Sequence, residues 1–164
     1  MKRQITIDGG VARIPLTQGM EAIIDADDVG LVSGFNWTVM RVGRTAYAKR
    51  NDTRGGTQKT VLLHRVIIGA AKTDCVDHRN GNGLDCRREN LRLASKPQNN
   101  RNTRMHRDNR IGFKGVCKHF SRYSASIQVN GQKQYLGMFA TAEDAHAAYC
   151  AASAIYHGEF GRTA

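Results

Sequence analysis

The chain has 164 residues, enough for one ordinary domain or for two or three small ones, because domains usually span about 50 to 200 residues. Lys and Arg number 25 against 14 Asp and Glu, and the formal net charge of +11 indicates a polyanionic partner, with nucleic acid the leading candidate. The sequence contains no apolar run of about 18 residues and no apolar core of a signal peptide near its start. We therefore expect a soluble, intracellular protein without a membrane segment.

The four cysteines are spread along the chain and form no Cys-x-x-Cys pair. This spacing predicts neither a zinc ribbon nor a disulfide framework. We expect reduced thiols that are mostly packed inside the protein, as free cysteines usually are. The residues concerned are Cys75, Cys86, Cys117 and Cys150.

Residues 1–60 alternate short apolar runs with Gly and Asp turns, which predicts a small β-rich unit. One helical turn is expected around residues 27–33, and Trp37, the only tryptophan, is expected in the core. The stretch RNDTRGGTQKT indicates an exposed hairpin tip. It leads into VLLHRVIIGA, which is interpreted as a strand running into a helix.

Residues 76–100, VDHRNGNGLDCRRENLRLASKPQNN, predict a hairpin followed by a helix. Residues 76–78 would end one strand, the Asn and Gly residues at 80–83 would form the turn, and residues 91–94 would return as a second strand. Ser95 with Gln98 three residues later then forms a capping box that opens a helix. A polar, Asn-rich loop without catalytic function is the alternative for this stretch.

A row of arginines follows this predicted helix start. They recur at intervals of three, a spacing that would keep them near one face of a helix and suit contact with a phosphate backbone. A solvated helix face is the alternative interpretation. The row consists of Arg101, Arg104, Arg107 and Arg110.

The pair Asp77-His78 contains groups that phosphodiester hydrolysis requires. A metal ion held by oxygen ligands stabilises the charge that develops on the phosphorus oxygens and on the leaving oxygen. An imidazole with an ordinary pKa of about 6.5 can take the proton of the attacking water at neutral pH. The segment therefore indicates a metal-assisted nuclease site.

The order L-H-R, V-D-H-x-N-G-N, E-N-L-R and P-x-N-N resembles the HNH endonuclease family, specifically its phage and intron homing type with a ββα-metal fold. The resemblance implies that Asp77 and Asn99 bind the metal, that His78 is the general base and that Asn90 orients His78. Asn100 is the alternative to Asn99. Such oxygen ligands suit Mg²⁺ or Mn²⁺, with waters and DNA phosphate completing the shell. His64 matches the L-H-R position but has no assigned role.

The last segment predicts a three-stranded antiparallel sheet and one helix. Residues 123–129 alternate apolar and polar side chains, Asn130-Gly131 is a hairpin turn signal, and QKQYLGMF is the returning strand. The stretch GFKGVCKHF supplies a further strand before them. Thr141 with an acid three residues later starts a helix that runs to about His157 and that Gly158 terminates.

The patterns G-F-K-G-V, Y-x-A-x-I, Y-L-G-x-F-x-T-A-E-D-A and H-G-E-F resemble the plant ethylene-response-factor (APETALA-type) DNA-binding domain. The resemblance implies that the sheet lies in the major groove of DNA and that the helix backs it. The plant domains carry several Arg and two Trp on this sheet, so the target sequence cannot be carried over. The DNA-contacting residues offered in this region are Lys114, Lys118, Gln128, Lys133 and Tyr135.

Together these patterns predict an α+β protein with a β-rich N-terminal region (1–60), an HNH ββα-metal core (61–108) and an APETALA-type domain (109–164). The predicted function is a metal-dependent DNA endonuclease, acting as a monomer or weak dimer and nicking one strand at a time, inside a phage-infected or prokaryotic cell. One alternative is a non-catalytic, sequence-specific DNA-binding regulator. Another is a nuclease that acts on RNA.

Overall fold

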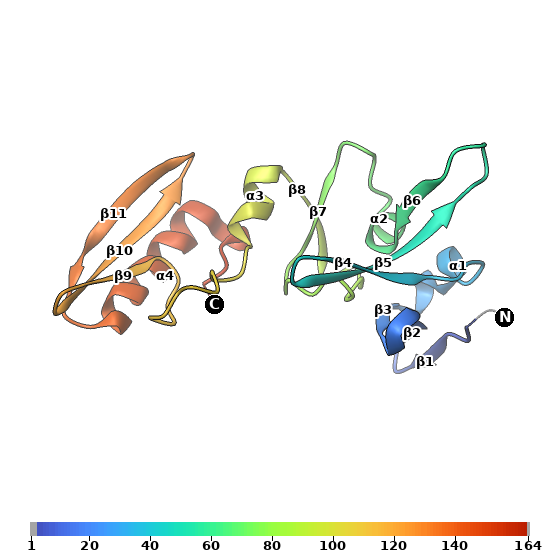
Figure 1. The fold of residues 1–164 in the computed structure, drawn as a ribbon, viewed down its shortest axis with the longest axis horizontal. Coiled ribbons are helices and arrows are strands. Elements are labelled where there is room, and N and C mark those ends of the chain that lie inside the picture. The colour runs from blue at the N-terminus through green and yellow to red at the C-terminus, as the bar shows by residue number, and fades with distance from the viewer. Residues whose placement is uncertain (1–2, 164) are drawn as a thin grey trace. The chain divides into compact units, whose positions relative to one another are not determined.

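The computed structural model describes residues 3–163 and divides the chain into two compact units, Met1–Lys96 and Pro97–Ala164 (Figure 1). Both combine small antiparallel sheets with helices, and a longer helix lies near the C-terminus. The mixed α/β character that the sequence predicts is confirmed. The division into three domains near residues 60 and 108 stays a prediction. Among the described residues no helix is long and apolar enough to span a membrane.

The first unit begins with a sheet in the order β1-β2-β3. Its strands are β1 (Thr6–Asp8), β2 (Val11–Pro15) and β3 (Glu21–Asp25), with the short 3-10 helix η1 (Thr17–Gly19) between the last two. A 3-10 turn, η2 (Ala26–Asp28), and helix α1 (Val29–Val32) follow. This confirms the helical turn expected around residues 27–33.

A second sheet has the order β4-β5-β6 and leads into a short helix. The elements are β4 (Thr38–Val42), β5 (Thr45–Asp52), β6 (Lys59–Leu62) and α2 (Leu63–Ile68). The hairpin tip expected at RNDTRGGTQKT joins β5 to β6, and the strand-to-helix passage of VLLHRVIIGA is confirmed. Gly69 ends α2 with a φ of 67°, a left-handed conformation that glycine adopts without steric cost.

The predicted hairpin of the candidate nuclease segment is present as β7 (Cys75–His78) paired with β8 (Leu91–Ala94). Helix α3 (Lys96–Arg101) follows, so two strands and a helix succeed one another as the ββα pattern requires. The boundary between the two compact units falls inside α3, after Lys96. The packing of this helix against the hairpin, and with it the ββα-metal arrangement, stays a prediction.

One hydrophobic core joins the N-terminal sheets to the β7–β8 region. Trp37 is 1% exposed, as expected, and packs in the same cluster as Ile24, Leu63 and Leu91. The loop between β7 and β8 also pairs with the edge of β3: the Ile23 N–H donates to Leu84 O at 2.9 Å, and the Cys86 N–H donates to Ile23 O at 2.8 Å. The β7–β8 hairpin is thus built into the N-terminal fold.

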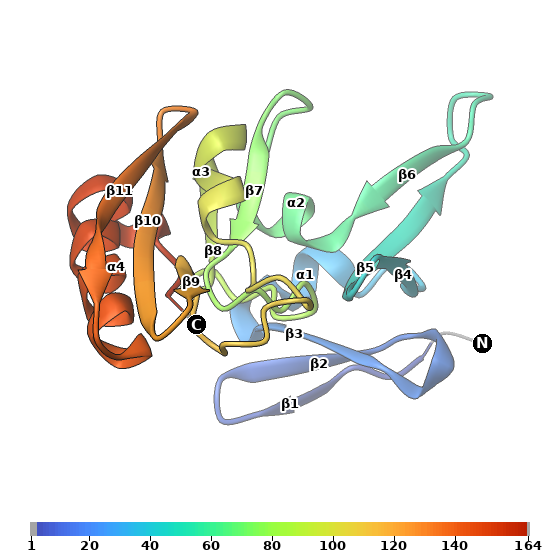
Figure 2. The ribbon, with the colours of Figure 1, turned by 60° about the vertical axis from the view of Figure 1, so that its left-hand side comes forward.

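The second unit is a three-stranded antiparallel sheet with a helix packed on one face, as the sequence predicts (Figures 1 and 2). Its strands are β9 (Val116–His119), β10 (Arg122–Val129) and β11 (Gln132–Phe139). Helix α4 (Ala142–His157) begins at Thr141, whose Oγ1 accepts a hydrogen bond from the Asp144 N–H, and η3 (Gly158–Phe160) follows it. The expected capping arrangement is therefore confirmed.

The alternation of side chains gives this sheet an inner and an outer face. Val116, Ala125 and Ile127 are buried on the inner face, where Ala145 and Tyr149 of α4 cover them. Cross-strand partners share a face. The outer face therefore carries the pairs Arg122–His119, Ser124–Cys117, Ser124–Met138, Ser126–Tyr135 and Gln128–Lys133.

The arginine row does not lie on one helix, because α3 ends at Arg101. Residues 102–115 form turns, bends and irregular chain. The Asn109 side chain stabilises a turn there, since its Oδ1 accepts hydrogen bonds from the N–H groups of Ile111 and Gly112. Such local bonds compete with helix formation. The expectation of a shared helical face for Arg101, Arg104, Arg107 and Arg110 is thus wrong.

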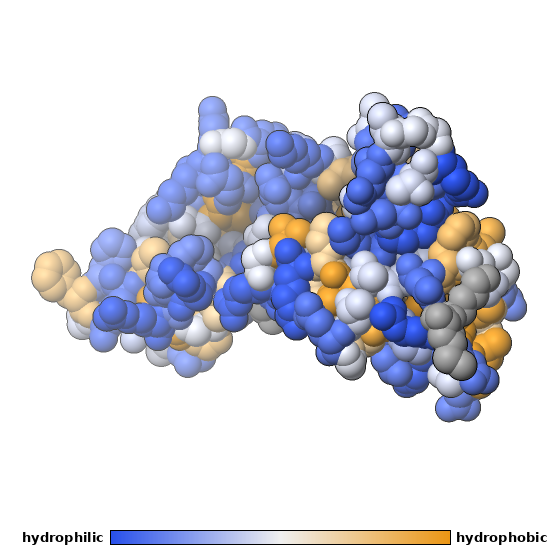
Figure 3. Space-filling model, turned by 45° about the vertical axis from the view of Figure 1, so that its right-hand side comes forward, coloured by the Kyte–Doolittle hydropathy of each residue, from blue (hydrophilic) through white to orange (hydrophobic). Residues whose placement is uncertain are grey.

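Figure 3 shows one face of the molecule, on which hydrophilic residues predominate and hydrophobic residues form separate patches. All four cysteines are free, as predicted, but their burial differs: Cys86 is buried, Cys117 is exposed, and Cys75 and Cys150 are intermediate. The expectation of mostly packed thiols therefore fails at Cys117, which stands on the outer face of the second unit's sheet.

Candidate active site

Asp77 and His78 are the last two residues of β7, and both are buried, with 4% and 6% of their surface exposed. Across the hairpin Asp77 lies opposite Arg92, and His78 lies opposite Leu91. Because successive strand residues point to opposite faces, the two side chains leave the strand in different directions. They sit where the strand gives way to the Asn80-Gly83 turn.

Asp77 forms a buried ion pair with Arg92. Its Oδ2 accepts hydrogen bonds from Nε of Arg92 at 2.8 Å and from a terminal guanidinium nitrogen at 2.6 Å. The two side chains are only 5% and 7% exposed, so each charge compensates the other where water is scarce. Arg92 was not among the predicted site residues, although its position opposite Asp77 in the predicted hairpin was the signal that could have identified it.

The His78 ring forms a cluster with two other aromatic rings. The His64 ring meets the His78 ring edge-on, with centroids 5.0 Å apart, and the Tyr47 ring lies 5.6 Å from His64 and 5.9 Å from His78. His64 comes from α2 and Tyr47 from β5. No local pattern indicates Tyr47, because its contact with His78 spans about thirty residues and depends on how the second sheet packs.

Burial controls the protonation of both imidazoles. It lowers the pKa of His78 to about 4, although the nearby carboxylates of Asp77 and Asp85 act in the opposite direction. Burial, with the neighbouring His78 and Arg65, lowers the pKa of His64 to about 3. Both rings are therefore neutral at neutral pH, and a neutral imidazole can accept a proton.

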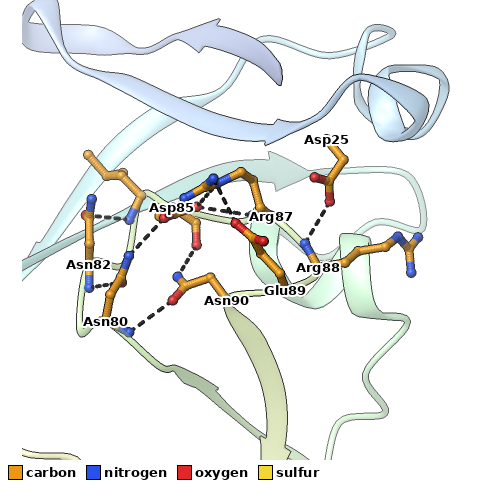
Figure 4. A network of polar contacts seen from close by, with 9 residues as sticks. Asp25, Asn80, Asn82, Asp85, Arg87, Arg88, Glu89 and Asn90 are labelled. Carbon is orange, nitrogen blue, oxygen red and sulfur yellow. Dashed lines mark hydrogen bonds and ion pairs between the residues drawn. The ribbon is translucent and has the colours of Figure 1, made fainter. Parts of the chain in front are cut away.

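Asn90 holds the turn that follows His78 (Figure 4). Its Oδ1 accepts a hydrogen bond from the Asn80 N–H at 3.0 Å, and its Nδ2 donates to the Asp85 carbonyl at 2.7 Å. The Arg79 N–H in turn donates to the Asn90 carbonyl at 2.9 Å. Asn90 thus fixes the backbone immediately after His78, and this is the route by which it could orient the base.

A network of polar contacts ties the end of the turn to β3, where Asp25 Oδ2 accepts a hydrogen bond from the Arg88 N–H at 2.8 Å (Figure 4). Arg87 donates to both carboxylate oxygens of Asp85, at 2.9 and 2.8 Å, and Asn80 Nδ2 donates to Asp85 Oδ2. Burial works to raise the pKa of Asp85, but the hydrogen bonds from Arg87 and Asn80 outweigh it and hold that pKa below its usual value. Arg88 reaches Asp28, at 2.7 Å for the closest pair of atoms.

Gly83 has no room for a side chain. A Cβ atom there would lie 2.5 Å from the Ala46 carbonyl oxygen and 2.7 Å from the Tyr47 ring. We expect Gly83→Ala to destabilise the protein by about 1–3 kcal/mol in chemical denaturation, because the turn or Tyr47 must move. The control is Gly30→Ala in α1, where nothing lies within 4 Å and a small stabilisation is expected. Equal stability of the two variants would contradict the close approach of turn and ring.

Acid should destabilise the protein through His64. Because the pKa of His64 is about 3 when folded and about 6.5 when unfolded, the unfolded chain binds more protons between these values. His64 therefore favours folding fully above about pH 6.5, and this contribution is lost as the pH falls, by up to about 1.4 kcal/mol per pH unit. Urea unfolding from pH 7 to 5 should show a shallower pH slope for His64→Gln than for wild type. The exposed control His106→Gln should keep the wild-type slope, and an unchanged slope in His64→Gln would contradict the assignment.

The second predicted metal ligand, Asn99, and its alternative Asn100 lie in α3. Both belong to the second unit, which begins at Pro97. Asn100 and Arg101 line a pocket of about 530 Å³ in that unit, together with Lys114 and Gln128. The pairing of Asp77 with Asn99 stays a prediction. Among residues 3–163 no group of three or more His, Cys, Asp or Glu side chains is placed to hold a metal ion.

The predicted DNA-contacting residues fall into several groups. Gln128, Lys133 and Tyr135 share the outer face of the sheet, and Tyr135 is 64% exposed. Lys118 lies opposite Tyr123, on the face that α4 covers, although its side chain is exposed.

The remaining predicted contacts lie outside the sheet. Lys114 is half-buried, and its Nζ donates to the carbonyls of Arg101 and Thr103. Burial, with Arg162 nearby, lowers the pKa of its ammonium group. Arg104 and Arg107 stand in the irregular chain after α3.

Comparison with known proteins bears on one part of this arrangement. Residues 61–101 match the model of the HNH endonuclease family. The HNH-matched segment includes Asp77, His78, Asn90 and Asn99, while Tyr47 lies outside it. The match supports a nuclease that acts on DNA, and HNH nucleases generally use divalent metal ions. No curated protein and no solved structure matches the chain, so the APETALA-type resemblance of residues 109–164 rests on their motifs alone.

Proposed function

We propose that this protein is a metal-dependent DNA endonuclease whose catalytic pair is Asp77 and His78. The observation that carries the proposal is the position of this pair at the buried end of β7, inside the HNH-matched segment, with His78 in contact with two further rings. The net charge of +11 supports a nucleic acid substrate. One such site per chain would nick a single strand unless two chains associate, and the enzyme would be of the homing type that its motifs resemble.

Asp77 and Asn99 would hold the metal ion, and Asn100 is the alternative to Asn99. A carboxylate and an amide oxygen are hard donors of the kind that Mg²⁺ and Mn²⁺ prefer, so the chemistry of the donor set fits the ion. When bound, the ion would neutralise charge on the scissile phosphate and its leaving oxygen. The Arg92 guanidinium, at 2.6 Å from Asp77 Oδ2, fixes the direction in which the carboxylate points.

His78 would take the proton of the attacking water. Burial lowers its pKa to about 4, so the ring is in the neutral form that can accept a proton at neutral pH. Tyr47 would restrict the ring through a tilted contact and His64 through an edge-on contact, and Asn90 would fix the backbone that follows it. In this proposal His78 is the proton acceptor, and the other three residues hold it in position.

The sheet of the second unit would contribute target recognition. Residues 109–142 contain no Asp or Glu, so the sheet and its loops carry positive charge alone. The outer face combines Lys133 and Arg122 with the exposed aromatic ring of Tyr135. Such a surface suits phosphate contacts from its cations and contacts to base edges or sugars from its polar and aromatic side chains.

A non-catalytic DNA-binding regulator is the second candidate. It is favoured by the fact that this basic sheet forms a compact unit of its own, apart from Asp77 and His78. Such a regulator would bind DNA and leave it intact under every metal condition.

The two candidates differ in one assay. Supercoiled plasmid is incubated with the protein in Mg²⁺, in Mn²⁺ and in EDTA, and open circles are counted over time. If the protein is an endonuclease, we expect open circles with either metal ion and none in EDTA. Binding without any conversion would support the regulator instead. Structured RNA added as a competitor should leave nicking unchanged, because a sheet that reads the major groove cannot enter the deep, narrow groove of A-form RNA.

A further inference from the structure

The turn between β9 and β10 holds the most exposed aromatic residue of the described chain. Phe120 and Ser121 connect the paired residues His119 and Arg122, and the Phe120 side chain is fully exposed. Its φ is 51°, in the left-handed region. The residue therefore combines an uncovered apolar ring with a backbone conformation that bulky side chains rarely adopt.

Neither property is explained by folding. A two-residue hairpin turn with positive φ prefers Gly, Asn or Asp, because a bulky side chain clashes with its own backbone there. The opposite hairpin of the same sheet follows this preference, with Asn130 at φ 50° and Gly131 at φ 82°. A ring that stays fully exposed also gains no burial energy to offset the cost. Phe120 thus conflicts with the folding preference of its position, which points to a role in binding a partner.

The surroundings of Phe120 specify the kind of partner. Lys118, His119 and Arg122 flank the turn, and the nearest acidic residues in sequence are Asp108 and Glu143. An aromatic ring between cations and without acidic neighbours suits a nucleic acid, whose phosphates bind the cations and whose bases offer flat faces. Proteins that bind the minor groove of DNA frequently insert apolar side chains such as Phe between base steps and partly unstack them.

We propose that Phe120 is a DNA-contacting wedge: its ring inserts at a base step of duplex DNA while Arg122 and Lys118 hold the adjacent phosphates. This inference rests on the proposed action on DNA, but it concerns binding and not cleavage. It adds the end of the sheet to the DNA-contacting surface, beyond the outer-face residues Gln128, Lys133 and Tyr135.

The test compares two glycine substitutions in the full chain. Phe120→Gly removes the ring and relieves the left-handed backbone, so we expect the thermal midpoint to hold or rise while affinity for duplex DNA falls about tenfold. Asn130→Gly relieves the same conformation at the opposite hairpin and should leave affinity within about twofold. Phe120→Trp keeps an aromatic ring at this position and should bind duplex DNA with affinity close to that of wild type. Affinity is measured by anisotropy in EDTA, where nicking does not interfere, on duplexes that wild type selects from a random library.

A spectroscopic signal identifies the wedge itself. The selected duplex is resynthesised with 2-aminopurine in place of individual adenines, and its fluorescence should rise at one step with wild type and stay low with Phe120→Gly. Wild-type affinity of Phe120→Gly, or absence of the fluorescence rise with wild type, would overturn the proposal. A loss of affinity confined to structured RNA would overturn it as well. If the protein gives these binding results but does not nick DNA in Mg²⁺, the nuclease proposal is refuted and the Phe120 proposal is still supported.

Discussion

Replacing His78 with alanine is expected to lower the rate of plasmid nicking by about 10²–10⁴-fold, the usual contribution of a general base. The variant loses the only imidazole that directly follows the predicted metal ligand, and His64 cannot replace it, because its ring lies 5.0 Å away, edge-on. The measurement is single-turnover conversion of supercoiled plasmid to open circles in Mg²⁺.

Two controls accompany this variant. His106→Ala removes an imidazole whose side chain is 79% exposed and should nick at the wild-type rate. His78→Gln keeps a polar side chain of similar size but cannot accept the proton. If the Ala and Gln variants lose activity equally, the loss comes from missing proton transfer and not from altered packing. Thermal unfolding of each protein confirms that the compared samples are folded. Wild-type rates for both His78 variants would remove His78 from the mechanism.

Asp77→Asn is expected to abolish nicking and also to destabilise the protein by about 3–5 kcal/mol. The instability arises because the Arg92 guanidinium stays buried, 7% exposed, while its carboxylate partner becomes a neutral amide. Chemical denaturation measures the free energy of unfolding, and the plasmid assay measures activity. By itself, this variant would not separate metal binding from stability.

The double variant Asp77→Asn/Arg92→Met makes that separation. Removing both charges should recover most of the lost stability, because no unpaired charge is then left buried. Nicking should stay absent, since an amide supplies an oxygen but not the negative charge with which the Asp77 carboxylate would bind the metal ion. A stable double variant that nicks at the wild-type rate would show that Asp77 serves the fold and not the metal.

Elements with a strong local signal were predictable from the sequence. The alternation in β10, the Asn130-Gly131 turn and the Thr141 cap each appear where expected, because their physical cause lies within a few neighbouring residues. The β7–β8 hairpin was predictable for the same reason. The helical arginine row was not, because Asn109 forms local hydrogen bonds that three-residue spacing alone does not reveal.

The surroundings of the candidate site depended on contacts between distant parts of the chain. Tyr47 reaches His78 only because β5 packs beside the turn, where Gly83 leaves space for its ring. The Arg88–Asp28 contact likewise joins residues sixty positions apart. The segment matched to the HNH family begins at residue 61, after Asp28 and Tyr47, so its predicted catalytic residues are held partly by the N-terminal sheets.

The central claim is that Asp77 and His78 form a metal-dependent nuclease site. Its most direct test is single-turnover nicking of one supercoiled plasmid by wild type, His78→Ala and Asp77→Asn/Arg92→Met, each verified as folded, with wild type repeated in EDTA. We predict open circles only from wild type in Mg²⁺. Open circles at the same rate from wild type in EDTA, or from either variant in Mg²⁺, would contradict the claim.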